Sequence, residues 1–128
     1  MPEEKSKHGF IVKVRPYKTP NPLNEFVIEA KTGDKWTVIA GELFYIEHSD
    51  YLKIALINVR VPWRGKGCSD DMMAKLLEMA KGRVILTGQI NAASYQMFLR
   101  MQKDGLLTLS PPRPKYYDET MWEVQSGK

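Results

Sequence analysis

The chain has 128 residues, of which 43% are hydrophobic and 27% charged, as expected for one ordinary globular domain. Nineteen basic and 15 acidic residues give a net charge of +4, which can attract an anionic partner but falls short of the basic tracts of nucleic-acid tails. One cysteine and two histidines exclude an internal disulfide, and we expect no metal site. There is no apolar leader and no apolar run of the roughly 18 residues that a membrane helix needs, so we expect a soluble, cytoplasmic protein.

The first half of the chain predicts four strands, because β-branched residues are frequent and apolar and polar residues partly alternate. The second and third strands form a hairpin around the turn at residues 32–34. Segment Pro16–Asn24 contains three prolines, which remove amide donors and fix φ, so we expect an irregular connection there. The predicted strands span residues 9–15, 25–31, 35–47 and 51–61.

The second half predicts two helices and three short strands. Apolar residues recur at helical spacing over Ser69–Ala80, with two aspartates in the first turn. Strand Arg83–Thr87 follows, and a strand–helix–strand unit implies two neighbouring parallel strands joined by a right-handed crossover. A second helix is predicted for Ala92–Lys103, with Asn91 as its N-cap. The closing strands are predicted for residues 106–109 and 120–124.

The stretch between the fourth strand and the first helix has the composition of an anion site. Gly65 and Gly67 allow the backbone amides to turn toward a ligand, and the free amides and dipole of a helix start attract negative charge. Arg64 and Lys66 add positive charge. The patterns GxxxxGK[ST] and GxGxxG are absent, which leaves mononucleotide hydrolysis and hydride transfer without support. We predict a phosphate or pyrophosphate site, the alternative being an ordinary solvated turn.

This loop resembles that of the Gcn5-related N-acetyltransferase (GNAT) superfamily, whose signature is Arg/Gln-x-x-Gly-x-Gly/Ala after a strand. The match here is Arg64-x-x-Gly67-x-Ser69, and Asn91, Ser94 and Phe98 stand where the family has Asn, Ala and Tyr. The resemblance implies an α/β (α+β) fold with a mixed, mostly antiparallel sheet, a parallel pair at its splayed middle strands and two main helices. It implies one domain over residues 1–128, of which residues 1–8 form a flexible N-terminus.

The resemblance also implies acetyl-CoA as the cofactor. In the family the loop amides bind its pyrophosphate, the fourth strand pairs with its pantetheine arm, an amine attacks the thioester directly, and a backbone amide stabilises the oxyanion. Cys68 would contribute as an ordinary loop position and not as a nucleophile. The cofactor-binding residues implied in this way are Val59, Val61, Arg64, Gly65, Lys66, Gly67, Cys68, Ser69 and Asn91.

Two departures from the family concern the acceptor side. Phe98 replaces a tyrosine that often protonates the departing thiolate, a role that Tyr95, Tyr116 or Tyr117 could take instead. Family members usually carry one or two helices between their first two strands, where this chain has only the proline-rich segment described above. An open acceptor side with a net charge of +4 suits an amine on a large or anionic partner, such as a protein or nucleic acid. A homodimer could also close the gap.

The acceptor amine must lose a proton. For a lysine-like amine with a pKa near 10.4, forming the neutral base at pH 7 costs roughly 4.6 kcal/mol. Tyr51–Ser69 contains no acidic residue, so Glu42, Glu47 and His48 are the nearest candidates by topology. The candidate catalytic residues are thus Glu47, His48 and Tyr95. The alternative is a non-catalytic domain of the same fold that binds protein or nucleic acid.

Overall fold

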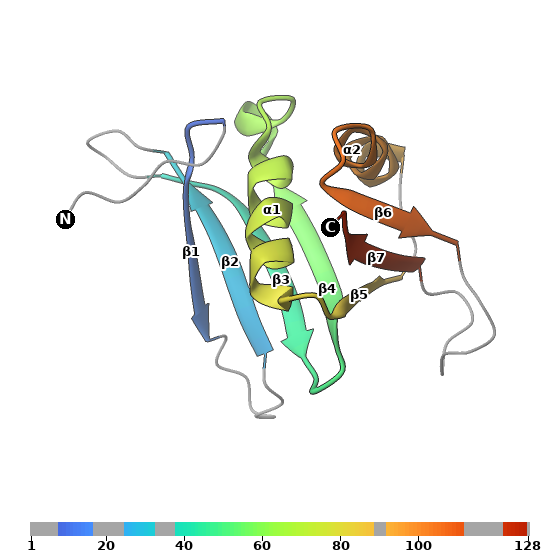
Figure 1. The fold of residues 1–128 in the computed structure, drawn as a ribbon. Coiled ribbons are helices and arrows are strands. Elements are labelled where there is room, and N and C mark those ends of the chain that lie inside the picture. Colours follow the sequence, from blue (N-terminus) through green and yellow to red (C-terminus); the bar gives the residue numbers. More distant parts are fainter. Residues whose placement is uncertain (1–7, 17–24, 33–37, 89–91, 112–121, 128) are drawn as a thin grey trace.

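The computed structural model describes residues 8–16, 25–32, 38–88, 92–111 and 122–127. Their seven strands form one sheet in the order β1-β2-β3-β4-β5-β7-β6 (Figure 1). The elements are β1 (Ile11–Pro16), β2 (Glu25–Lys31), β3 (Ile39–Glu47), β4 (Tyr51–Val59), the 3-10 turn η1 (Val61–Trp63), α1 (Cys68–Ala80), β5 (Val84–Thr87), α2 (Ala92–Lys103), β6 (Leu107–Ser110) and β7 (Trp122–Ser126). No described helix is long and apolar enough to cross a membrane.

All neighbouring strands run antiparallel except β4 and β5, which are parallel and flank α1 in the sequence. This is the mixed sheet with one parallel pair and two helices that the sequence and its family resemblance predict. β2 and α2 have the predicted bounds. β4 ends at Val59 instead of Val61, because Pro62 cannot donate to a strand ladder and the chain enters η1 there.

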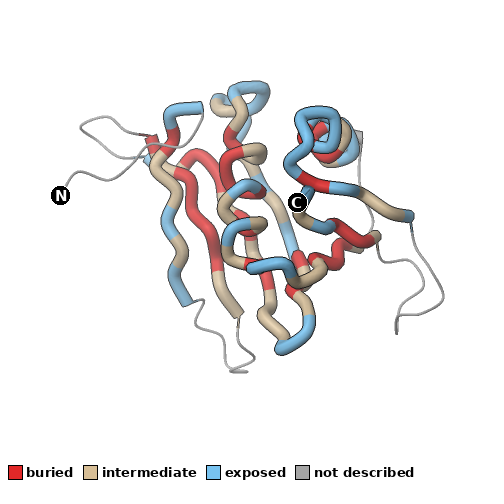
Figure 2. Tube along the Cα trace, in the orientation of Figure 1, coloured by how far each residue is buried: buried red, intermediate tan, exposed pale blue. Residues whose placement is uncertain are grey.

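Helix α1 covers one face of β2, β3 and β4 (Figure 1). Its apolar stripe, with Met72, Met73 and Leu76, is fully buried against core residues of the sheet such as Leu43. In Figure 2 buried residues are concentrated in β2, β3 and α1, whereas the second half of β4 is mostly exposed or intermediate. The tyrosine hydroxyl of Tyr45 points into the layer and donates a hydrogen bond to the sulfur of Met79 at 3.6 Å.

Strands β4 and β5 separate after a short common stretch. Their pairing begins at Tyr51 with Val84 and stops at Ile54 with Thr87, whereas β4 continues to Val59 paired with β3 alone. The β3–β4 register shifts at the point of separation, so that Ala55 is an extra residue on β4, as in a β-bulge. In the part of the chain that the structure describes, the second half of β4 therefore has a free edge on the side of β5.

Candidate cofactor site at the end of β4

The loop from β4 to α1 needs glycine at two positions. η1 closes with a hydrogen bond from Arg64 N–H to the Val61 carbonyl at 3.2 Å, and the chain then passes through Gly65 at φ 76° and Gly67 at φ 83°. Both values lie in the left-handed region that residues with a Cβ rarely adopt. Gly67 is also the N-cap of α1, so this conformation aims the start of the helix at the end of β4.

The amides at the start of α1 are available to a ligand. The first intrahelical hydrogen bond runs from Asp71 N–H to the Gly67 carbonyl at 3.0 Å, so the N–H groups of Cys68, Ser69 and Asp70 precede the helical ladder. Gly67 offers no side-chain cap to them. Arg64 and Lys66, in the loop that leads to these amides, are both exposed. Free amides, the helix dipole and two cations together form an environment for phosphate groups.

Two acidic side chains also lie in the first turn of α1, and both have partners. Asp70 accepts a hydrogen bond from Arg100 Nη2 of α2 at 2.9 Å. The carboxylate of Asp71 is 2% exposed and accepts the backbone N–H of His8, with distances of 3.1 and 3.3 Å to its two oxygens. The pairing with Arg100 and His8 therefore limits the repulsion that these carboxylates would exert on a bound anion.

Sequence reasoning did not find His8. Its imidazole lies directly against Gly67, where a Cβ would collide with the ring, and its Nε2 is 4.0 Å from Asp71 Oδ1. No periodicity or spacing links a residue near the N-terminus to a glycine about sixty positions later. His8, which precedes β1, thus lies next to the loop. Its ring leaves no room for a side chain at position 67, which is a second reason, besides the positive φ, for glycine there.

The free edge of β4 presents backbone groups next to the loop. Arg60 N–H donates to the Ala40 carbonyl of β3 at 2.9 Å, and backbone groups alternate sides along a strand, so those of Ile57 and Val59 point away from β3. In agreement with this, Arg64 Nε reaches the Val59 carbonyl at 3.0 Å. Val61 lies beyond the strand, in η1, with its side chain exposed.

Cys68 is buried at the start of α1. It is 2% exposed, and burial, with a smaller effect from Asp71, raises the pKa of its thiol to about 11. A thiol of this kind is protonated at neutral pH and is a poor nucleophile. Only its backbone amide faces the anion environment in the arrangement described above.

Glu47 and His48 lie at the turn between β3 and β4, beside the C-terminal end of α1. Glu47 Oε2 is paired with Arg83 Nη2 at 2.8 Å, and the His48 carbonyl accepts from Arg83 Nη1 at 3.0 Å. The imidazole of His48 stacks on Tyr51 with a centroid distance of 4.3 Å. These candidates therefore lie beside the paired part of β4, with Leu52 opposite Glu47, and not beside its free edge.

Tyr95 projects from α2 and is 39% exposed. Its ring meets Trp122 of β7 edge-on at 6.1 Å, and Trp122 is aligned across β5 with Thr87 and Ile54, where β4 and β5 separate. Phe98 is fully buried and has no hydroxyl to offer. The structure thus places Tyr95 near the point of separation but does not bring it together with Glu47 and His48. Asn91, Tyr116 and Tyr117 lie outside the described residues.

No family model matches the sequence, and comparison with curated proteins gives no match. Solved structures do match. An acetyltransferase of the GNAT family from Staphylococcus aureus Mu50 is 11% identical with a TM-score of 0.57, covering 83% of this chain and 70% of its own. Nourseothricin acetyltransferase is 15% identical with a TM-score of 0.58, covering 99% and 91%. Tetrahymena GCN5 is 10% identical with a TM-score of 0.55, covering 82% and 71%.

The structural similarity extends over most of the chain, but sequence identity is low, so these matches establish the fold alone. The chain therefore has the fold of the GNAT acetyltransferases.

Proposed function

We propose that the protein is an acetyl-CoA-dependent N-acetyltransferase. The observation that carries this proposal is that two backbone surfaces meet at one loop: the amides that begin α1 and the free edge of β4, neither of which pairs with other backbone among the described residues. The first suits a pyrophosphate, and the second suits an extended arm bearing amide groups. From Val59 to Ala55 the free edge is about 13 Å long, at about 3.3 Å per residue.

Each residue at the loop has a specific proposed role toward the cofactor. The amides of Cys68 and Ser69 would donate to the pyrophosphate, with the hydroxyl of Ser69 as a further donor, and Arg64 and Lys66 would supply charge. The backbone of Val59 would pair with the arm, after Arg64 releases its carbonyl. The bound thioester would supply an activated acetyl group, which passes to an amine nitrogen as the C–N bond forms, the C–S bond breaks and the thiolate leaves.

Residues on both sides of the sheet are proposed to move protons. Glu42 projects from the face opposite α1, across from Asn58 on the free part of β4, and no described side chain pairs with it. It is the carboxylate best placed to take the amine proton through water, ahead of Glu47 and His48. Tyr95 would return a proton to the thiolate.

The acceptor is proposed to be approached across an open sheet face. β1 ends at Pro16 and β2 begins at Glu25, so only residues 17–24 connect them. This short connection supports access by a large acceptor. Arg60, Arg64 and Lys66 lie in or directly before the loop proposed to bind phosphate, so part of the net positive charge would serve the cofactor and does not itself argue for an anionic acceptor.

The proposal is tested by titrating CoA and acetyl-CoA into the protein in a calorimeter and by following thiol release with a panel of amines. Gly67→Glu should abolish binding, because it adds bulk and negative charge to the loop and forces a side chain against His8. Thr108→Glu adds the same charge at an exposed position of β6 and should bind like wild type. If the wild-type protein binds neither CoA nor acetyl-CoA, the proposal is wrong. Binding without transfer would favour the non-catalytic alternative.

A further inference from the structure

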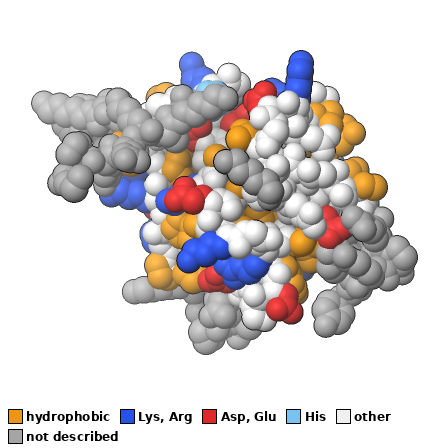
Figure 3. All heavy atoms as spheres, viewed as in Figure 1, with side chains coloured by type: hydrophobic (Ala, Val, Ile, Leu, Met, Phe, Trp, Pro, Cys, Tyr) orange, Lys and Arg blue, Asp and Glu red, His pale blue; other side chains and the backbone are white. Residues whose placement is uncertain are grey.

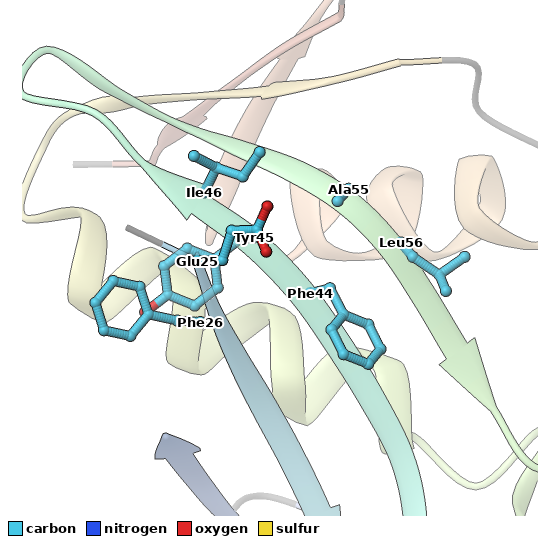
Figure 4. Close-up of a pocket in the computed structure, with 7 residues that line it drawn as sticks. All are labelled: Glu25, Phe26, Phe44, Tyr45, Ile46, Ala55 and Leu56. Atoms are coloured by element: carbon cyan, nitrogen blue, oxygen red, sulfur yellow. The ribbon is translucent and has the colours of Figure 1, made fainter. Parts of the chain in front are cut away.

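A shallow hollow of about 250 Å³ lies on the sheet beside the bulge of β4. Its lining comes from three strands: Glu25 and Phe26 of β2, Phe44, Tyr45 and Ile46 of β3, and Ala55 and Leu56 of β4. Figure 4 shows Phe44 and Leu56 side by side on the face turned away from α1. They are direct partners in the β3–β4 register, and Leu56 is 54% exposed, an unusually large exposure for a leucine in the middle of a sheet.

The hollow lies where the proposed cofactor arm would end. Ala55 is the bulged residue of β4, and Ile54 before it is the last residue that β5 pairs with. An extended arm that runs down the free edge from the loop would therefore bring its reactive end to Ala55, next to Leu56. A group held in the hollow would lie within one or two residues of the transferred acyl group.

The charge at the hollow is negative. Glu25 is the one carboxylate among the lining residues, and no described side chain pairs with it. Glu42 lies two residues from Phe44 on the same face of β3. Glu29, a further acid on the same face of β2, is bound by Arg15 at 3.0 Å. Lys53 lies opposite Ile46 in the register but does not line the hollow.

We propose that the acceptor is a cationic primary amine carrying an apolar group of about the size of one aromatic ring. The apolar group would pack on Phe44 and Leu56, and the ammonium would be attracted by Glu25. A cavity of about 150 Å³ is enough to hold benzene, so the hollow has room for a ring and part of a linker. Before attack the ammonium gives one proton to Glu42 through water. The free nitrogen then takes the acetyl group, and the thiol leaves.

The same surface disfavours other amines. A hydrophilic acceptor would lose hydration on the apolar side chains without gaining hydrogen bonds there, and a carboxylate beside Glu25 would be repelled. This inference rests on the proposed acetyl transfer and adds the class of amine to it.

The test compares initial rates of acetyl transfer to 2-phenylethylamine, n-hexylamine, ethanolamine and 4-(2-aminoethyl)benzoate. We expect kcat/KM for the first two to exceed that for ethanolamine by about tenfold or more, the range found for one apolar group in a pocket. The benzoate, which adds a negative charge to the ring, should be the poorest of the aromatic amines. Leu56→Ser and Glu25→Gln should each raise KM for 2-phenylethylamine several-fold with acetyl-CoA affinity unchanged.

Matched controls exclude a general loss of stability. Leu106 is 43% exposed after α2, so Leu106→Ser makes the same change on a similarly exposed leucine outside the hollow. Glu78→Gln removes a carboxylate from the exposed side of α1, where it pairs with Lys75. Both variants should keep the wild-type KM.

The outcomes separate the two proposals. If acetyl-CoA neither binds nor reacts with any amine, the proposed function fails and this inference fails with it. If transfer occurs but ethanolamine or the benzoate is preferred, or if Leu56→Ser behaves like Leu106→Ser, the amine class is wrong while the acetyltransferase proposal stands.

Discussion

Cys68 and Tyr45 are the two described residues whose pKa values the fold shifts most clearly. Burial raises the pKa of the Cys68 thiol from 9.0 to about 11 and that of the Tyr45 hydroxyl from 10.0 to about 12. In both cases the neutral form is stabilised by the fold. The unfolded chain therefore loses these protons at lower pH than the folded protein does, and stability falls as the pH rises above about 9.

The Cys68 contribution can be isolated with one variant. Between pH 8 and pH 10 the free energy of unfolding should fall by about 1 kcal/mol because of this thiol, as the linkage relation gives for such a shift. Urea denaturation of wild type and Cys68→Ala at both pH values measures it. The variant lacks a buried thiol of the core cluster and should be less stable at pH 8, but its decline toward pH 10 should be smaller. An equal decline in both proteins would contradict the assignment.

The residues around the loop differ in how far their roles could be predicted from the sequence. Two glycines and two cations before a helix predicted an anion loop from sequence, because few other roles need that set. His8 carried no such signal, since its contact with Gly67 depends on how β1 is placed next to α1 in three dimensions. Glu42 likewise gains its position only from the β3–β4 register, which puts it opposite Asn58.

At the scale of elements, Arg83 joins the end of α1 to the β3–β4 turn. Its guanidinium donates to the Ala80 and Met79 carbonyls at 2.9 and 3.1 Å, to the His48 carbonyl at 3.0 Å and to Glu47 at 2.8 Å. The side chain is 24% exposed, so these charge-assisted bonds are partly shielded from water. The Arg83 side chain thus donates to carbonyls at the C-terminal end of α1, where no further helical turn follows to supply N–H donors.

Removal of this group should be costly. We expect Arg83→Ala to lower the free energy of unfolding by about 2 to 3 kcal/mol, because several bonds to a charged donor are lost together. Arg100→Ala is the matched control: its pair with Asp70 is solvent-exposed and should contribute less than about 1 kcal/mol. Thermal and urea denaturation of the three proteins compares them. Similar losses in both variants would mean that Arg83 acts as an ordinary surface cation.

Most element positions followed from sequence, whereas the separation of β4 and β5 did not follow from the residue pattern itself. The apolar run of β4 continues without interruption past Ile54. The strands part because β5 has four residues and β4 has nine, so the shorter strand leaves the longer one unpaired. Helix ends and turns are local and were therefore predictable, but strand order and the bulge at Ala55 depend on partners far away in the chain.

At the scale of the whole molecule, basic residues lie near one end of β4 and exposed apolar side chains lie beside its bulge. The loop end has Arg60, Arg64 and Lys66 near the amides of α1, whereas the hollow beside the bulge is apolar with one carboxylate. In the view of Figure 3, too, basic, acidic and apolar side chains are interspersed over the α1 side without one dominant charged surface. The protein as a whole is thus only mildly basic, and a strong field is expected near the loop alone.

This separation predicts two different responses to salt. Raising ionic strength from about 0.05 M to 0.5 M shortens the screening length from roughly 14 Å to about 4 Å and weakens attraction between exposed charges. The Kd for CoA should rise several-fold, because its phosphates are attracted by exposed Arg64 and Lys66. KM for 2-phenylethylamine, measured with saturating acetyl-CoA, should rise less than the Kd for CoA, because one carboxylate, Glu25, attracts the amine and apolar contacts provide the rest of its binding. Lys66→Gln should flatten the first dependence without altering the second. Equal salt sensitivity of both ligands would show that charge, and not apolar contact, governs binding on both sides of β4.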